Sequence, residues 1–146
     1  MIFVMFTAFV AAFGFAVIFD VSRSELVYCG IAGLTAEGVF QIMQYIYEEK
    51  SVAILAAAVV VTALVRILAN VRKTPVTVYL ISGIIPLVPG GAMYNTVFNI
   101  IASDYVTAIE SGIDAVKSAS AVAIGIVLVF ALPNKLFLRM RNKNTI

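Results

Sequence analysis

Histidine is absent from this chain, and cysteine occurs once, as Cys29. Without histidine a Ser-His triad cannot form, and most metal sites and the usual proton shuttle near neutral pH lose their common side chain. A single cysteine excludes a disulfide within the chain. No nucleotide-binding motif is present, and no nucleophile, acid pair or set of metal ligands is assembled. We therefore expect no metal, no cofactor and no enzymatic activity.

Charge is also scarce, at 12% of the 146 residues, whereas 62% are hydrophobic. Soluble domains carry roughly 25% charged residues, so a surface this poor in charge is not suited to water. The net charge of +2 and the absence of a basic stripe argue against a nucleic-acid partner. The composition therefore predicts an all-α integral membrane protein.

Five continuous apolar segments are long enough to cross a membrane as helices, since a span needs about 20 mostly apolar residues. Continuous rather than alternating apolar runs argue against a β-barrel. The first segment has no Lys or Arg before it, so we expect a retained helix rather than a signal peptide. Short connections predict one transmembrane domain over 1–146. The expected spans are approximately 1–19, 26–47, 52–71, 77–102 and 113–133, followed by a basic cytoplasmic tail over 134–146.

The distribution of basic residues predicts the orientation, because cytoplasmic loops are enriched in Lys and Arg. Five spans place the termini on opposite sides. With the N-terminus outside and the C-terminus inside, only Lys50 and Lys117 of the ten basic residues lie outside. We therefore expect a multi-pass protein of the cytoplasmic (inner) membrane in that orientation.

The fourth span contains two prolines three residues apart, Pro86 and Pro89, followed by Gly90 and Gly91. Proline lacks the N–H that an α-helix needs and clashes with the preceding turn, so this span should break near the middle of the bilayer. Broken backbone at that depth is tolerated where it is buried in protein or lines a cavity, as in transporter substrate sites. A kink that only shapes packing is the alternative.

A half-helix restarting near Gly90 would direct free N–H groups at an anionic part of a substrate. Asn95 and Asn99 lie four residues apart and share a face just beyond, and Tyr94 could close the site. The candidate substrate-binding residues are therefore Pro86, Pro89, Gly90, Gly91, Tyr94, Asn95 and Asn99.

Glu37 lies in the middle of the second span, and Gln41 and Gln44 follow on the same helical face. A carboxylate at this depth costs at least about 2.5 kcal/mol, so it usually faces a cavity or a partner. One interpretation makes Glu37 and Gln41 proton-coupling groups, and the other makes Glu37 a protonated contact between helices or subunits. Because Glu37 and the break lie at similar depth, we expect Glu37, Gln41, Asn95 and Asn99 to line one cavity with the broken backbone.

Two features concern packing. Arg66 lies in the inner third of the third span, where snorkelling to the cytoplasmic interface is the simpler expectation. Small residues four apart, such as Ala8 with Ala12 and Ala121 with Gly125, allow close approach of helices.

Several of these residues form a pattern that resembles the threonine/serine exporter family. The pattern is Arg66 followed by Pro75, then GIIPLVPG over 83–90, then Tyr94; the stretch GFAVIFDVSRSELVYCGIAG over 14–33 also fits. In particular it resembles the small component, which is related to the C-terminal half of full-length exporters. The resemblance implies a membrane exporter of small polar metabolites, either threonine and serine or dicarboxylates such as succinate. It also implies a larger membrane subunit of the same family as partner.

The sequence thus predicts a membrane subunit of a secondary exporter, driven by the proton gradient, with a homo-oligomer also possible. The competing hypothesis is a non-transporting assembly or scaffold subunit.

Overall fold

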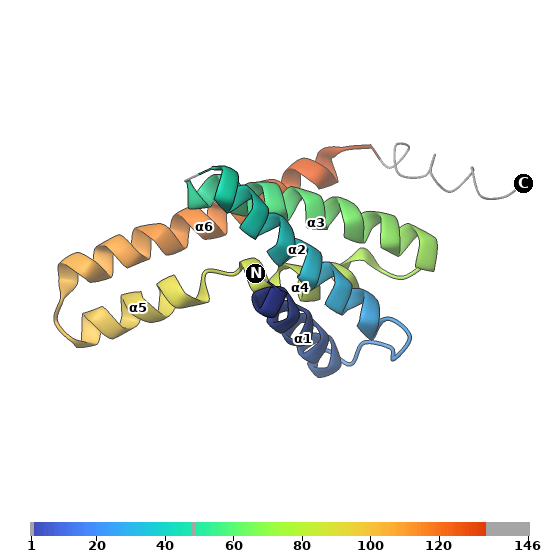
Figure 1. The fold of residues 1–146 in the computed structure, drawn as a ribbon, viewed down its shortest axis with the longest axis horizontal. Coiled ribbons are helices and arrows are strands. Elements are labelled where there is room, and N and C mark those ends of the chain that lie inside the picture. The colour runs from blue at the N-terminus through green and yellow to red at the C-terminus, as the bar shows by residue number, and fades with distance from the viewer. Residues whose placement is uncertain (1, 48, 134–146) are drawn as a thin grey trace, which may run out of the picture.

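The computed structural model describes residues 2–47 and 49–133. These residues form helices and connecting turns and include no strand. The helices are α1 (Ile2–Ile18), α2 (Leu26–Ile46), α3 (Lys50–Arg72), α4 (Val76–Ile84), the short 3₁₀ helix η1 (Ile85–Leu87), α5 (Gly90–Ile101) and α6 (Tyr105–Ala131), as Figure 1 shows. The expected all-α class is confirmed.

Three of the described helices, α2, α3 and α6, are each long and apolar enough to cross a membrane. A fourth crossing results if the bent pair Val76–Leu87 and Gly90–Ile101 counts as one span. Helix α1 is apolar but has only 17 residues, which is at the short end of what a bilayer requires.

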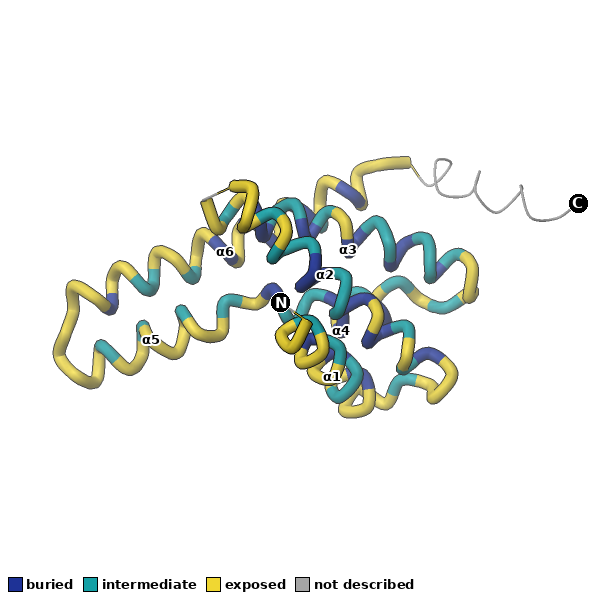
Figure 2. The backbone as a smooth tube through the Cα atoms, viewed as in Figure 1, coloured by how far each residue is buried: buried dark blue, intermediate teal, exposed yellow. Residues whose placement is uncertain are grey.

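The core lies where α2 and α3 pack together and against α4, while α1 covers α2 and α6 covers α3. Its buried side chains are mostly small, and alanine predominates among them. Figure 2 shows this buried region at the centre of the molecule, with exposed residues on the outer sides of the helices. Small side chains let helix backbones approach closely, which is how helices associate in lipid.

The small-residue pairs expected from the sequence lie at these contacts. Ala8 is 7% exposed and Ala12 is fully buried in α1, and Gly125 of α6 is buried against α3. A Cβ atom added at Gly125 would lie 2.7 Å from the Cβ of Ala58 and 3.1 Å from the carbonyl oxygen of Leu55. The expectation of tight packing is therefore confirmed at these pairs.

Helix α5 and the first half of α6 form a hairpin that extends away from the other helices, at the left of Figure 1. No residue of α5 is buried, and the facing half of α6 is mostly exposed.

Helix α6 starts at Tyr105, not near residue 113 as the sequence suggested. Asp104 caps this earlier start by accepting hydrogen bonds from the backbone N–H and the hydroxyl of Thr107. Glu110, which lies between the expected fourth and fifth spans, is on an exposed helical face.

Three turns use a non-glycine residue in the left-handed region. Asp20 follows α1, Lys73 caps the end of α3 and Ser103 follows α5, with φ angles of 54°, 56° and 61°. A left-handed residue directly after a helix satisfies its last carbonyl groups and reverses the chain. These turns bring consecutive helices back alongside each other.

Candidate functional site

The chain bends sharply between α4 and α5. Helix α4 ends at Ile84, the 3₁₀ turn η1 contains Pro86, and α5 starts at Gly90 directly after Pro89. The two helical parts differ in direction by 54°. In place of regular α-helical bonding, the Val88 N–H donates to the Ile85 carbonyl at 3.1 Å and the Gly90 N–H donates to the Val88 carbonyl at 2.7 Å. The interruption coincides with the residues that lack an N–H or a side chain.

A cavity of about 270 Å³ lies against this bend. Pro86, Pro89 and Gly91 line it from the bend, Glu37 lines it from α2, and Lys50 lines it from the first turn of α3. The remaining lining residues are Phe40, Ile54, Leu87, Val88 and Ala92. Three segments distant in sequence therefore meet around one space that contains a carboxylate, an ammonium group and the start of a helix.

Glu37 is the most enclosed of the charged groups at this cavity, with 9% of the residue exposed. Its carboxylate accepts a hydrogen bond of 3.0 Å from the side-chain amide of Gln41, one helical turn later. Glu37 and Pro86 also border a second hollow of about 270 Å³, whose other walls come from α1 at Val4, Thr7, Ala8 and Ala11. Glu37 therefore borders two hollows.

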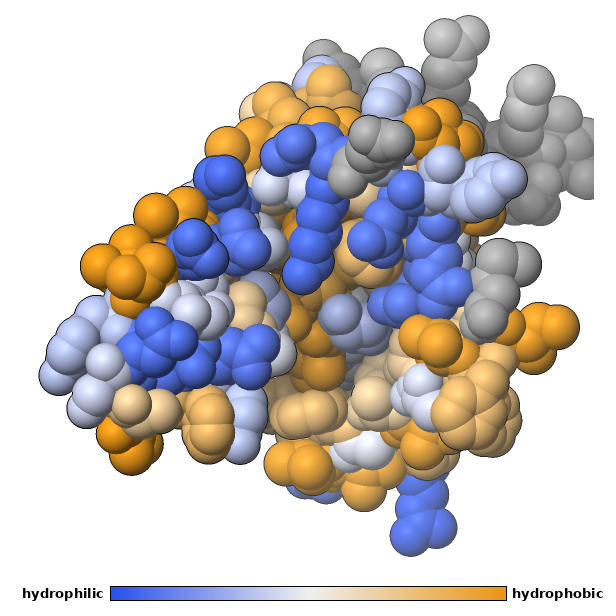
Figure 3. Space-filling view, turned by 60° about the vertical axis from the view of Figure 1, so that its left-hand side comes forward, coloured by the Kyte–Doolittle hydropathy of each residue, from blue (hydrophilic) through white to orange (hydrophobic). Residues whose placement is uncertain are grey.

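Lys50 is exposed at the edge of the cavity. Other exposed charged residues lie directly before α3, at Glu49, and before or in the first half of α6, at Asp104, Glu110, Asp114 and Lys117. Figure 3 shows hydrophilic residues gathered on the face that turns forward, with hydrophobic surface around them. This face differs from the apolar exterior expected where a helix contacts lipid.

Several of the substrate-binding residues expected from the sequence lie outside the cavity at the bend. Tyr94 is 66% exposed and stacks on Phe98, with ring centroids 6.0 Å apart. Asn95 is exposed and Asn99 is half-buried, and neither lines the cavity at the bend. Gly90 starts α5 but does not line that cavity either. The structure thus brings together Glu37, Gln41 and the bend, while the polar residues farther along α5 lie beyond them.

Arg66 is enclosed rather than extended to a surface, since only 5% of the residue is exposed. Its guanidinium donates hydrogen bonds to the carbonyl oxygens of Val129 and of Leu132, the latter at 3.2 and 3.3 Å. It also lies 5.3 Å from the ring centre of Phe130. The expectation of snorkelling is therefore wrong: the cation binds the last carbonyl groups of α6, where the negative end of the helix dipole favours it.

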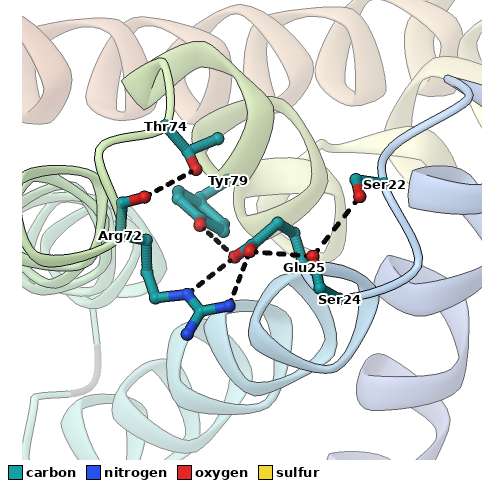
Figure 4. Close-up of polar contacts among 6 residues, drawn as sticks. All are labelled: Ser22, Ser24, Glu25, Arg72, Thr74 and Tyr79. Carbon is teal, nitrogen blue, oxygen red and sulfur yellow. Dashed lines mark hydrogen bonds and ion pairs between the residues drawn. The ribbon is translucent and has the colours of Figure 1, made fainter.

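A second polar cluster joins α2, α3 and α4, as Figure 4 shows. Glu25, directly before α2, forms an ion pair with Arg72 at 2.7 Å and accepts a hydrogen bond from the Tyr79 hydroxyl. Ser24 donates to the same carboxylate at 3.1 Å, and the Arg72 guanidinium lies 4.7 Å from the ring centre of Tyr28. The hydrogen bond from Arg72, followed by that from Tyr79, lowers the pKa of Glu25 to about 2.

The sequence did not single out this cluster, although a signal was present. Glu25 and Arg72 lie at the ends of consecutive expected spans that meet the same side of the membrane. Opposite charges at matching depth on adjacent antiparallel helices indicate a pair. Tyr79 carried no comparable signal, because an aromatic residue in an apolar helix more often serves as packing.

The long apolar helices, their small-residue contacts and the enclosed carboxylate beside a helix break define a multi-pass helical membrane protein. A family model described as "Threonine/Serine exporter, ThrE" matches residues 4–132. The chain belongs to this threonine/serine exporter family, and it is a membrane transport subunit of that type. A transporter family is consistent with a chain that is not an enzyme. Searches of curated proteins and of solved structures gave no match.

Proposed function

We propose that this chain is one subunit of a proton-coupled secondary exporter and that the cavity at the α4–α5 bend is its substrate site. The observation that carries this proposal is the position of Glu37, an enclosed carboxylate that lines the same cavity as Pro86, Pro89 and Gly91. Enclosed ionisable groups on membrane helices usually mark substrate or proton pathways. Interrupted helices supply backbone groups to such sites in many transporters.

In this proposal the chain crosses the inner membrane five times. The spans are α1, α2, α3, the broken α4–η1–α5 segment and α6, with the N-terminus outside and the C-terminus inside. The excess of basic residues on one side supports this orientation. The N–H groups of Gly91 and Ala92, in the first turn of α5, lie before the first residue that can bond back within this helix, and they are suited to the carboxylate of threonine, serine or a dicarboxylate such as succinate.

Glu37 serves in this mechanism as the group that exchanges protons. Its carboxylate is enclosed and accepts a hydrogen bond from the side-chain amide of Gln41. In this proposal a proton reaches Glu37 from one of the two hollows that it borders and leaves by the other. Tyr94, Asn95 and Asn99 lie farther along α5 and are proposed to line the continuing substrate path.

A larger membrane subunit of the same family is the proposed partner. The α5–α6 hairpin supports this, because α5 has no buried residue and presents Asn95 on an exposed position. An amide on a membrane helix is better satisfied by protein than by lipid. The same observation favours the second candidate function, in which the chain only stabilises that subunit and does not contact substrate.

Glu37→Gln tests the two candidates in cells that produce both subunits. If Glu37 exchanges protons, the variant should lose pH-dependent export of threonine, serine or succinate while its abundance in the membrane stays unchanged. Glu110→Gln provides the matched control, because it makes the same change on an exposed face of α6. Wild-type export by Glu37→Gln would exclude proton coupling through this residue and favour the scaffold function.

A further inference from the structure

Lys50 is a charged residue at the proposed substrate site that the family pattern does not include. It begins α3 and lines the cavity that Glu37 lines from α2. The basic residues Arg72 and Lys73 lie at the opposite end of α3, next to the connection to α4, and are not among the residues that line this cavity. One cavity is therefore bounded by one positive and one negative side chain from two different helices.

The size of the cavity restricts what these two charges can bind. Its volume is about 270 Å³, slightly below the range of about 300–1,000 Å³ typical of small-molecule pockets. A substrate with few non-hydrogen atoms suits this space. The hydrophobic walls from Phe40, Ile54 and Leu87 leave the charged groups as the features that orient it.

An α-amino acid carries an ammonium and a carboxylate on one carbon atom, and its two charges match the two signs at the cavity. Charge-assisted hydrogen bonds are roughly twice as strong as neutral ones, so this match favours binding. A dicarboxylate would place a negative charge against Glu37 and would leave no cation for it. Two carboxylates that share one small cavity repel each other unless one of them is protonated.

We propose that Lys50 determines specificity by pairing with the substrate carboxylate while Glu37 faces the substrate ammonium group. The first turn of α5 at Gly91 and Ala92, which lines the same cavity, adds backbone N–H groups on the side of the carboxylate. This inference rests on the proposed function and adds to it a substrate class, a zwitterion rather than a dianion. It also gives Glu37 two competing cations, the proton and the substrate ammonium.

The test measures export of labelled threonine by the two-subunit exporter carrying Lys50→Met, Lys50→Arg or the control Lys117→Met. Lys117 lies on an exposed face of α6 and does not line the cavity. Losing one charge-assisted hydrogen bond corresponds to a rise in KM of about tenfold or more. Lys50→Met should show this rise, Lys50→Arg should largely retain the wild-type KM, and Lys117→Met should not change it.

Competition by analogues gives a readout that does not depend on how much protein reaches the membrane. Threoninamide lacks the carboxylate, N-acetylthreonine lacks the ammonium group, and succinate lacks any cation. For the wild type, threonine and serine should compete while these three compounds should not. In Lys50→Met the preference for threonine over threoninamide should disappear, whereas Glu37→Gln should weaken the preference over N-acetylthreonine.

The outcomes separate this inference from the proposed function. If the wild-type pair exports neither amino acids nor dicarboxylates, the proposed function fails, and the inference fails with it. If it exports threonine but Lys50→Met keeps both the wild-type KM and the preference over threoninamide, only the role of Lys50 is refuted. If succinate competes with threonine equally well, the zwitterion class is refuted.

Discussion

Adding one methyl group at Gly125 should weaken the contact between α3 and α6. The Cβ atom of Gly125→Ala would lie 2.7 Å from the Cβ of Ala58, 3.1 Å from the Leu55 carbonyl oxygen and 3.2 Å from the Val59 backbone nitrogen. Ordinary contact at 3.4 Å or more requires the two helices to move apart by about 0.7 Å. None of the three atoms belongs to the far end of a flexible side chain, so the helices themselves must move.

Overpacking of this kind typically costs about 1–3 kcal/mol. Alanine also has a higher helix propensity than glycine by up to about 1 kcal/mol, which offsets part of that cost. The net expectation is a loss of about 0–2 kcal/mol in the free energy of unfolding, with the larger values if α3 and α6 resist separation. The measurement is reversible denaturation of the purified protein in detergent micelles, compared with Gly14→Ala.

Gly14→Ala is the matched control, because a Cβ atom there meets nothing within 4 Å. That variant should be unchanged or stabilised by up to about 1 kcal/mol. The double variant Ala58→Gly with Gly125→Ala removes the closest contact and should recover part of the stability. The reasoning is refuted if Gly125→Ala gains as much stability as Gly14→Ala, or if the double variant shows no coupling between positions 58 and 125.

The remaining predictions concern the second polar cluster and the orientation. Because the pKa of Glu25 is lowered from 4.5 to about 2, its ionised form contributes stability that is complete above about pH 4.5 and is lost as the pH falls toward 2. Glu25→Gln should therefore be less stable than wild type at pH 7 and should lack that acid-induced loss in a pH series of denaturation curves; identical pH profiles would contradict this. For orientation, a cysteine at Glu49 or Ala102 should react with an impermeant thiol reagent in intact cells, and one at Arg23 should react only after permeabilisation. Cys29 is fully buried and should give little background labelling. Labelling of Arg23→Cys in intact cells would indicate the opposite orientation.

Local features of the chain were predictable from sequence because their causes are local. The bend at Pro86 and Pro89 follows from the missing N–H groups, and the apolar runs of α2 and α3 are continuous enough to mark helices without tertiary information. The start of α6 was harder to predict from the sequence. Asp104 and Glu110 both lower the local hydropathy, and only the hydrogen bonds from Thr107 to Asp104 identify the first as a cap.

Contacts between segments distant in the sequence could be predicted from the sequence only in part. Equal depth suggested that Glu37 lies near the bend, and both line one cavity. Depth does not specify which helices are neighbours or which way a face points, so the same reasoning did not indicate that Asn95 lies on an exposed position. Arg66 was misread for a related reason. Its partners are main-chain carbonyl groups of α6, and carbonyl groups leave no mark in a residue pattern.

Gly90 and Gly91 have a consequence for the mechanical behaviour of the α4–α5 segment. Neither glycine has a positive φ, and a Cβ atom at either position would meet nothing within 4 Å. The observed conformation therefore does not require glycine at these two positions. Each glycine weakens the start of α5 by up to about 1 kcal/mol relative to alanine, so unwinding and rewinding this turn is inexpensive. The 54° bend thus lies next to a helix start that is easily unwound. Alanine at 90 should stabilise this start without adding an atom to the cavity lining, whereas alanine at 91 would add a methyl group to a residue that lines the cavity.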